Sequence, residues 1–299
     1  MKSAPPHDGV IVPLVTPATA DGRLDAAAAE RLVAHVADHG CGMLVAGTTG
    51  EVASLTDDTR RRFVEIAVRV AARRVPVFAC VAHNCFENAV ALGREHLRAG
   101  ADAVVAMLPN YFKLEPVEML RYFAQLADAI AGPLYLYNMP LTTGMSVPLD
   151  VIEVLSRHSH ILGMKDSEGT PGRREAVAER FAGRADFALF MGVAAHSAAA
   201  LRLGFRGVVP SSGNLHPDLW RDLYRAAQTK DWPRVDALQQ KTDAFAALYQ
   251  PGRSLGQSLA ALKAGCDGAG LCGPTMFSPL TPLESPDRAA VCARLAQFT

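Results

Sequence analysis

The sequence predicts an α/β fold, a (β/α)8 TIM barrel followed by a small C-terminal helical domain. Eight short apolar runs alternate with longer segments of helical periodicity, and glycines and prolines mark the boundaries between them. This alternation is typical of parallel βαβ units. The last part of the chain adds helical segments with no strand between them. We therefore place the barrel in residues 1–230 and the helical domain in residues 231–299.

The predicted strands are short runs rich in valine and other apolar residues. In a parallel sheet both faces are covered, so its strands are nearly continuous in apolar residues rather than alternating. The eight runs are residues 10–15, 42–46, 75–81, 103–108, 133–137, 161–164, 187–191 and 207–209. Eight such runs are the number that a closed barrel of this class requires.

The predicted helices fill the intervals between these runs. They cover residues 26–39, 57–73, 87–99, 117–131, 149–157, 173–182 and 196–203, with a closing helix at 217–228 and three more at 232–248, 254–264 and 286–298. Helices tend to start with proline and end with glycine. The sequence follows this rule, with prolines at 116, 148 and 171 and glycines at 40, 100, 132, 183 and 204.

Composition excludes several classes of protein. Of the 299 residues, 49% are hydrophobic and 20% are charged, which predicts a globular core rather than disorder. Basic and acidic residues balance at 30 each, so overall charge favours a small ligand over nucleic acid. The apolar run at residues 9–15 is too short and too interrupted by proline for a signal or membrane segment, so we expect a cytoplasmic protein without membrane association. The six cysteines form no Cys-x-x-Cys pair that would indicate a zinc site or a redox dithiol.

Polar residues follow five of the predicted strands. In barrels of this class the active site forms at the carboxyl ends of the strands. The segments concerned are residues 47–51, 109–111, 137–140, 165–167 and 210–214. We expect all five segments to face one cavity at that end of the barrel.

Lys165 is the sharpest candidate among these residues, because it follows the run 161–164 directly. A neutral amine attacks a carbonyl to form an imine, and apolar surroundings favour the neutral form. Tyr137 ends the neighbouring run, and a phenol there is a plausible proton shuttle. From position alone, Lys165 could instead extend out of the rim beside Asp166, and Tyr137 could be a core aromatic residue.

Thr48 and Thr49 stand between two glycines after the second run. Their hydroxyl and backbone N–H groups would suit the carboxylate of a 2-oxo acid. An ordinary tight turn is the alternative interpretation. The segment lacks the Gly-Lys-Ser/Thr ending of a nucleotide-binding loop.

The combination of these motifs closely resembles the dihydrodipicolinate synthase and N-acetylneuraminate lyase superfamily, over essentially the whole chain. The motifs are Gly47-Thr48-Thr49-Gly50-Glu51, Tyr137-Asn138-x-Pro140 and Gly163-x-Lys165-Asp166, in the expected order and spacing. The resemblance implies a Schiff base on Lys165 and acid/base catalysis by Tyr137. It implies that Thr48 and Thr49 bind the carboxylate and relay protons.

The resemblance further implies that Tyr111 completes the proton relay by crossing into a neighbouring subunit. Members of the family usually form homotetramers built as dimers of dimers. Their substrates are pyruvate and an aldehyde. We also predict substrate contacts at Ser167, Gly192, Val209 and Ser211, at or near strand ends.

Two departures from the family pattern bear on the second substrate. In dihydrodipicolinate synthases the loop after Tyr-Asn-x-Pro carries an arginine that binds the carboxylate of aspartate semialdehyde, whereas Thr142 stands at that place here. A hydroxyl cannot replace a bidentate cation. Sialic acid lyases place acidic residues after the seventh strand, but here the residues after Gly192 are valine and two alanines.

The sequence therefore predicts a Schiff-base-forming lyase or aldolase, or an aldolase-like hydratase or dehydratase, that acts through Lys165 and requires neither a metal nor an organic cofactor. Its substrate would be a 2-oxo acid, which an aldolase would cleave to pyruvate plus an aldehyde, for example a 2-keto-3-deoxy sugar acid or a 4-hydroxy-2-oxo acid. One alternative is 4-hydroxy-tetrahydrodipicolinate synthase, with Arg173 or Arg253 replacing the missing arginine. A second alternative, of another class, is a non-catalytic protein that binds a 2-oxo acid or sugar acid.

Overall fold

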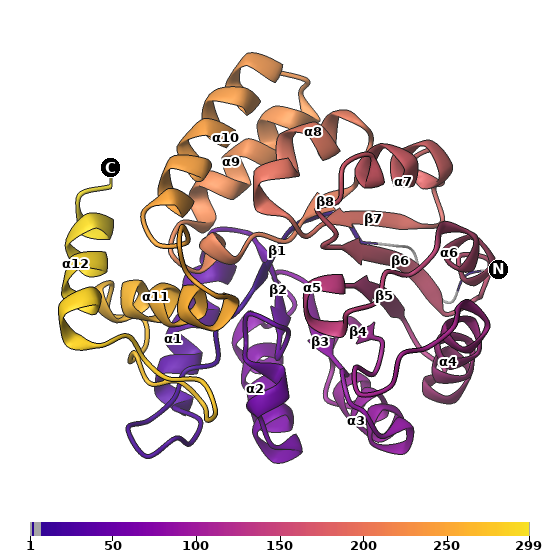
Figure 1. Cartoon of the computed structure of the whole chain (residues 1–299), viewed down its shortest axis with the longest axis horizontal. Helices are drawn as coiled ribbons and strands as arrows, with labels where there is room; N and C mark the ends of the chain where they lie inside the picture. The colour runs from indigo at the N-terminus through magenta and orange to yellow at the C-terminus, as the bar shows by residue number, and fades with distance from the viewer. Residues whose placement is uncertain (1, 3–6, 299) are drawn as a thin grey trace.

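The computed structural model, which describes Lys2 and residues 7–298, shows a closed barrel of eight parallel strands (Figure 1). The strands follow chain order around the barrel, and β8 pairs with β1 to close it. They are β1 (Gly9–Pro13), β2 (Gly42–Val45), β3 (Val77–Cys80), β4 (Ala103–Met107), β5 (Leu134–Asn138), β6 (Ile161–Asp166), β7 (Ala188–Met191) and β8 (Gly207–Val208). The predicted (β/α)8 fold is confirmed.

Strand β6 is longer than the predicted run 161–164. It continues through Lys165 and Asp166, which pair in register with the last two residues of β5 on one side and of β7 on the other. The sequence pattern identified only the apolar residues of this strand. The ladder also includes two charged residues, because the neighbouring strands form hydrogen bonds with their backbone N–H and C=O groups. Lys165 is therefore held by strand pairing on both sides.

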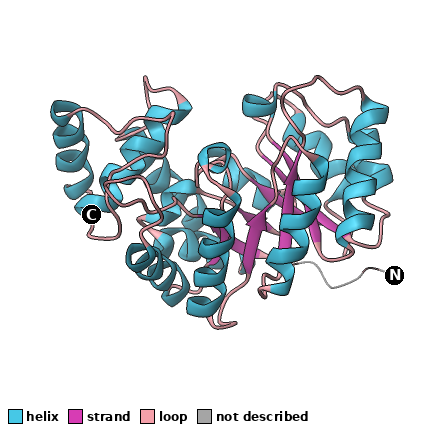
Figure 2. Cartoon of the chain, turned by 90° about the horizontal axis from the view of Figure 1, so that it is seen from below, coloured by secondary structure: helices cyan, strands magenta, loops and turns pink. Residues whose placement is uncertain are grey.

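Helices surround the strands, as Figure 2 shows from below. Those of the barrel are α1 (Ala26–Asp38), α2 (Asp57–Ala71), α3 (Phe86–Arg98), α4 (Pro116–Ile130), α5 (Pro140–Thr143), α6 (Leu149–Leu155), α7 (Arg173–Phe181), α8 (Ser197–Arg202) and α9 (Pro217–Gln228), with 3-10 turns η1 (Val52–Ser54), η2 (Ala194–His196) and η3 (Ser211–Asn214). The short α5 was not predicted. It starts at a proline and ends at Gly144, whose φ of 66° suits glycine.

Aromatic side chains fill the interior of the barrel. The ring centroids of Phe78 and Tyr135 lie 4.9 Å apart, and that of Phe190 lies 5.8 Å from Tyr135. The Tyr135 hydroxyl accepts a hydrogen bond from the backbone N–H of His7, ahead of β1, at 2.8 Å. The interior towards the amino ends of the strands is thus a packed core rather than a pore.

Three helices follow the barrel, α10 (Trp232–Ala247), α11 (Leu255–Gly268) and α12 (Ser285–Ala296). Helix α10 packs against α9, and α12 packs against α11. In Figure 1 these orange and yellow helices lie beside the barrel, with the C terminus away from the N terminus. Within the described part of the chain, none of the helices has the length and apolar character needed to span a bilayer.

Candidate active site

A cavity of about 460 Å³ opens at the carboxyl ends of the strands. Every predicted site residue except Tyr111 lines it, namely Thr48, Thr49, Tyr137, Lys165, Ser167, Gly192, Val209 and Ser211. They come from β2, β5, β6, β7 and β8 or from the loops directly after them. The barrel geometry therefore brings together residues that are up to 163 positions apart in the chain, from Thr48 to Ser211.

Lys165 and Tyr137 are neighbours across the β5–β6 ladder. The Lys165 Nζ lies 3.9 Å from the centroid of the Tyr137 ring, and the two side chains are only 7% and 2% exposed. An ammonium or amine over an aromatic face is a favourable arrangement. The lysine therefore lies inside the barrel mouth and does not extend out of the rim.

The Tyr137 hydroxyl also lies close to the loop after β2. Its oxygen is 3.3 Å from the Thr48 Oγ1. A proton can pass between two hydroxyl groups at hydrogen-bond distance. The Tyr137 ring thus lies beside the Lys165 amine, and its hydroxyl lies beside the Thr48 hydroxyl, along one wall of the cavity.

Hydrogen bonding and close packing against neighbouring segments hold the loop 47–51 in place. The Thr16 Oγ1 donates to the Gly50 carbonyl at 2.7 Å, and a Cβ at Gly50 would lie 3.0 Å from the Leu14 carbonyl oxygen. Glu51 adopts a left-handed backbone conformation, with φ of 60°. This conformation is uncommon for residues other than glycine, so surrounding contacts must hold it.

A buried ion pair supplies that contact. Glu51 Oε1 lies 2.6 Å from Nζ of Lys263 on α11, with side-chain exposures of 0% and 1%. The Glu51 Oε2 accepts from the Phe277 backbone N–H at 2.8 Å, and the Lys263 Nζ donates to the Thr275 carbonyl at 2.6 Å. The C-terminal part of the chain therefore holds the loop 47–51 in place.

Gly192, directly after β7, leaves no space for a side chain. A Cβ there would lie 1.9 Å from the Ser167 Oγ and 3.0 Å from the Lys165 Cε. The absence of a side chain lets Lys165 and Ser167 occupy the same corner of the cavity. The structure thus places these three predicted residues in direct proximity.

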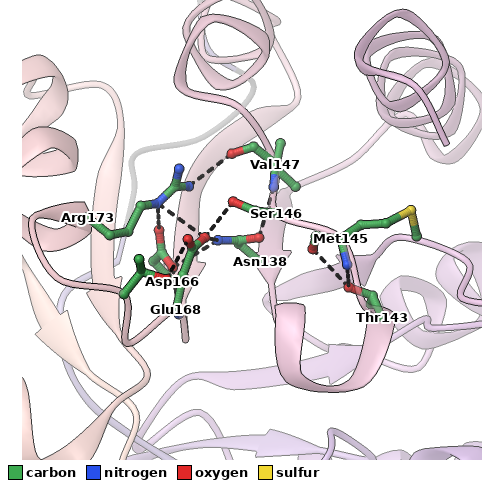
Figure 3. A network of polar contacts seen from close by, with 9 residues as sticks. Asn138, Thr143, Met145, Ser146, Val147, Asp166, Glu168 and Arg173 are labelled. Atoms are coloured by element: carbon green, nitrogen blue, oxygen red, sulfur yellow. Dashed lines mark hydrogen bonds and ion pairs between the residues drawn. The ribbon is translucent and has the colours of Figure 1, made fainter. Parts of the chain in front are cut away.

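A polar network joins the ends of β5 and β6 behind the cavity (Figure 3). Asn138 Nδ2 donates to Asp166 Oδ1 at 3.0 Å and to Glu168 Oε2 at 2.9 Å. The Arg173 Nε donates to the other Asp166 oxygen at 2.9 Å. Asp166, the residue after Lys165, is therefore paired with both Asn138 and Arg173.

The environment shifts the two carboxyl groups in opposite directions. Burial raises the pKa of Asp166 above its usual range, although the Arg173 guanidinium beside it opposes this. Burial also acts to raise the pKa of Glu168, but hydrogen bonds from Ser146 and Asn138 outweigh it and lower the pKa overall. Glu168 therefore carries the stronger preference for the charged form.

Tyr111 does not reach the cavity within one chain. Its side chain is 79% exposed, and its ring packs edge-on against Phe112, which is 72% exposed. The segment after β4 turns outward, so the strand-end rule that placed the other residues fails here. The expected crossing into a neighbouring subunit stays a prediction.

Arg173 and Arg253, the alternatives to the missing arginine, both form ion pairs with carboxylates. Arg173 is 9% exposed within the network of Figure 3, and Arg253 forms an ion pair with Asp287. Of the residues that line the cavity, all in the described part of the chain, only Lys165 and Asp243 are charged. The Thr142 hydroxyl donates to the Met139 carbonyl at 3.3 Å.

Sequence reasoning missed the contribution of the C-terminal helices to this cavity. Side chains from α10, α11 and the loop between them form its outer wall, among them Asp243, Tyr249, Gln250, Leu255, Ser258, Leu259 and Leu262. One signal was present, because Lys263 stands within the apolar run 259–266. A lone lysine in such a run must find a buried partner. Among the described residues, no three His, Cys, Asp or Glu side chains are grouped so as to hold a metal ion.

Comparison with known proteins gives a consistent result. The model of the dihydrodipicolinate synthetase family matches residues 6–298. The 4-hydroxy-tetrahydrodipicolinate synthase of Alkalilimnicola ehrlichii is 32% identical over 277 residues, which cover 92% of this chain and 93% of that protein. That of Acidiphilium cryptum is 34% identical over 234 residues, 78% of this chain and 80% of the relative.

Solved structures are similar over nearly the whole chain. Dihydrodipicolinate synthase from Bacteroides thetaiotaomicron has a TM-score of 0.92 and 30% identity, covering 98% of this chain and 99% of that one. YagE of E. coli K12, described as a prophage protein of the dihydrodipicolinic acid synthase family in complex with pyruvate, has a TM-score of 0.90 and 27% identity, covering 97% and 98%. A sialic acid aldolase from Ruminococcus gnavus, 20% identical with a TM-score of 0.87 and covering 100% of both chains, shares the fold.

Proposed function

Because the chain belongs to the dihydrodipicolinate synthetase family, we propose that it is a class I lyase that binds a 2-oxo acid such as pyruvate covalently on Lys165. The observation that carries this proposal is the position of Nζ, 3.9 Å from the Tyr137 ring inside the cavity. Fold alone would not require a lysine, a phenol and two threonines at one strand-end corner. A purely binding role for the cavity would not need them either.

Imine formation uses the lysine and the phenol. The neutral amine of Lys165 adds to C2 of the oxo acid, and the former carbonyl oxygen becomes a hydroxyl group. Tyr137 donates a proton to this hydroxyl, which leaves as water, and a protonated imine remains. Thr48 and Thr49 hold the substrate carboxylate with hydroxyl and backbone N–H groups.

Cleavage then proceeds from the imine of a 4-hydroxy-2-oxo acid. The Tyr137 phenolate takes the proton of the C4 hydroxyl, the C3–C4 bond breaks, and C4 becomes the carbonyl of the released aldehyde. The bond electrons move to C2–C3 with the imine nitrogen as their sink, which gives an enamine. Protonation at C3 and hydrolysis by water release pyruvate and free Lys165.

The acceptor half of the cavity is suited to an aldehyde without a carboxylate. Among the described residues, Lys165 is the only cation that lines the cavity, and it is used for the imine. An anionic aldehyde would lie near Asp243 without a compensating charge, and a desolvated charge without a partner is unfavourable. We therefore propose a neutral aldehyde as the second product, as in the cleavage of a 2-keto-3-deoxy sugar acid.

A second candidate activity is 4-hydroxy-tetrahydrodipicolinate synthase, which the names of the curated relatives favour. It requires a site for the carboxylate of aspartate semialdehyde. Arg173 and Arg253 are both paired with carboxylates, which argues against this activity. Efficient condensation of pyruvate with aspartate semialdehyde in a coupled assay would overturn our substrate assignment.

We also propose assembly as a homotetramer, a dimer of dimers, with Tyr111 entering the site of a neighbouring copy. Large apolar side chains are exposed at Tyr111, Phe112 and Leu141. These two segments are linked, because the Lys113 Nζ donates to the Thr143 carbonyl at 3.0 Å. Burial of this surface against another copy would remove apolar area from water. Light scattering of the purified chain gives the mass directly.

Trapping of the imine tests the proposed function. Incubation with pyruvate and borohydride should add a reduced pyruvyl group to Lys165, seen as a mass increase of the intact chain and located by peptide mapping. Lys165→Ala should give no adduct, and Tyr137→Phe should give it slowly, since the ring stays and the hydroxyl is lost. An adduct of undiminished yield in Lys165→Ala, or none in the unsubstituted chain, would overturn the proposal.

A further inference from the structure

The network of Figure 3 connects the two strand ends that carry the proposed catalytic pair. Asn138 follows Tyr137 at the end of β5, and Asp166 follows Lys165 at the end of β6. Because successive strand residues point to opposite faces, these two side chains lie outside the barrel while the catalytic ones lie inside. The network therefore acts on the backbone that carries Tyr137 and Lys165.

Arg173, the first residue of α7, is at the centre of this network. Its Nε donates to Asp166 at 2.9 Å and lies 3.6 Å from Glu168, and its Nη2 donates to the Val147 carbonyl at 3.0 Å. The Val147 N–H in turn donates to the Asn138 Oδ1 at 3.1 Å. One guanidinium thus joins three segments, the end of β6, the loop after α5 and, through Val147, the end of β5.

Burial makes this arrangement rigid. The side chains of Arg173, Asp166 and Glu168 are 9%, 3% and 12% exposed. Hydrogen bonds between ionised groups are stronger than neutral ones, and solvent competes little with them here. Loss of the guanidinium would leave two carboxylates close together without a cation, so they would move apart or take up a proton.

We propose that Arg173 is a positioning residue for imine formation, which fixes the distance between Lys165 and Tyr137 by holding Asp166 and Asn138. This inference rests on the proposed function. The amine must reach C2 while the phenol reaches the leaving oxygen, so both groups need one fixed separation. A misplacement of about 1 Å can lower a rate about 100-fold.

The network does not include the residues that hold the substrate carboxylate. Thr48 and Thr49 lie on the loop after β2, which is anchored separately by Thr16 and by the Glu51–Lys263 pair. Loss of Arg173 should therefore change the rate of the covalent step and leave the affinity for pyruvate almost unchanged. A general loss of structure would instead change both the rate of the covalent step and the affinity for pyruvate.

The experiment measures how fast the borohydride-trapped pyruvyl adduct forms, as a function of pyruvate concentration. In Arg173→Ala the rate at saturating pyruvate should fall at least about tenfold, with half-saturation within about twofold of the unsubstituted chain. Arg173→Lys should recover part of the rate, because an ammonium replaces the charge but not the guanidinium fork that contacts Asp166 and Val147 together. Arg180→Ala is the matched control, since Arg180 also lies on α7 and pairs with Asp150 and Glu153, away from the strand ends.

A second variant covers the case in which Arg173→Ala does not give a folded protein. Asn138→Asp keeps the size of the side chain and the acceptor for Val147 but removes both donated bonds, and it should slow the same step. Undiminished rates in the folded variants, or a raised half-saturation with an unchanged saturating rate, overturn the inference alone. Absence of any adduct in the unsubstituted chain overturns the proposed function and the inference with it.

Discussion

At the scale of single residues, Gly192 shows how closely the cavity is packed around the side chain of Lys165. The position after β7 has space for a hydrogen atom and no more, because Ser167 and Lys165 occupy the volume that a Cβ would need. The severe clash would be with the Ser167 Oγ, 1.9 Å from that Cβ, and the Lys165 Cε at 3.0 Å would be in tight contact with it. One added methyl group should therefore displace Ser167 and crowd the side chain of Lys165.

We predict that Gly192→Ala lowers kcat by about 100-fold, because it moves Lys165 and Ser167 from their positions. Steady-state pyruvate release and borohydride trapping both measure this loss. Gly169→Ala is the control, since nothing lies within 4 Å of a Cβ at that position, two residues beyond Ser167. A Gly192→Ala enzyme with the kcat of the Gly169→Ala enzyme would contradict the prediction.

His96 on α3 gives a second prediction, on stability. The ring is 1% exposed, and neither nitrogen has a hydrogen-bond partner among the described residues. Burial, together with the nearby Arg60 and Arg61, lowers the pKa of His96 to about 4 from its ordinary value near 6.5. The unfolded chain therefore takes up a proton below pH 6.5 that the folded chain refuses until about pH 4.

Folding stability should consequently fall as pH drops through this window. The free energy of unfolding should decrease by about 2 to 3 kcal/mol between pH 7.5 and pH 4.5 from this group. Urea unfolding at several pH values measures the slope, and His96→Leu should flatten it. Equal slopes in the two proteins would show that other groups cause any acid sensitivity.

At the residue scale, sequence could predict the part of the cavity that the strand ends form, because the strand-end rule is local. Lys165 follows an apolar run and Tyr137 ends one, and parallel strands in a closed barrel must present those ends together. Tyr111 also stands near the end of a run and yet turns outward. Its position depends on the conformation of a loop, which no local pattern specifies.

At the scale of secondary-structure elements, α11 and the loop after β2 depend on each other. The Glu51–Lys263 pair joins residues far apart in the chain, and both side chains are almost fully buried. A buried ion pair contributes little net stability, but removing one partner leaves a desolvated charge. The pair could not be predicted from sequence, since only the folded chain brings α11 beside the loop.

We predict that Lys263→Met lowers the free energy of unfolding by about 3 to 5 kcal/mol. The double variant Glu51→Gln, Lys263→Met should recover much of this loss, because a neutral amide can still accept from the Phe277 N–H. Denaturant unfolding of both single variants and the double variant gives the coupling between the positions. Additive losses in the double variant would contradict a direct interaction.

The end of β6 shows why element boundaries are harder to predict than element types. The apolar run predicted the strand but stopped short of Lys165, whereas the ladder continues through Asp166. An apolar side chain indicates a residue that is buried among apolar groups. Asp166 is charged but is buried against Arg173 and Asn138, so side-chain polarity does not predict that it belongs to the strand.

At the scale of the whole molecule, the helices after residue 231 complete the catalytic barrel. They supply the outer wall of the cavity and the partner of Glu51. The division into residues 1–230 and 231–299 stays a prediction, and we do not expect the two parts to fold independently.

We predict that a chain ending at residue 230 does not fold to a native barrel. It would expose the apolar surface that α9 buries against α10 and leave the Glu51 carboxylate without its cation. Circular dichroism with thermal melting should show no cooperative transition near that of the whole chain. A truncated chain that melts cooperatively and retains the pyruvyl adduct would show instead that the barrel is autonomous.

The two halves of the cavity differ in how freely they can diverge over evolutionary time. Lys165, Tyr137 and Gly192 sit in or beside the strand ladder, where neighbouring contacts restrict replacement. The outer wall, which we propose faces the aldehyde, comes instead from η2, α10 and α11, outside the ladder. After gene duplication, substitutions there would give a copy a new aldehyde preference while the proposed imine chemistry is inherited unchanged. Mutant libraries confined to these segments should accordingly yield altered substrate range more often than libraries at the strand ends.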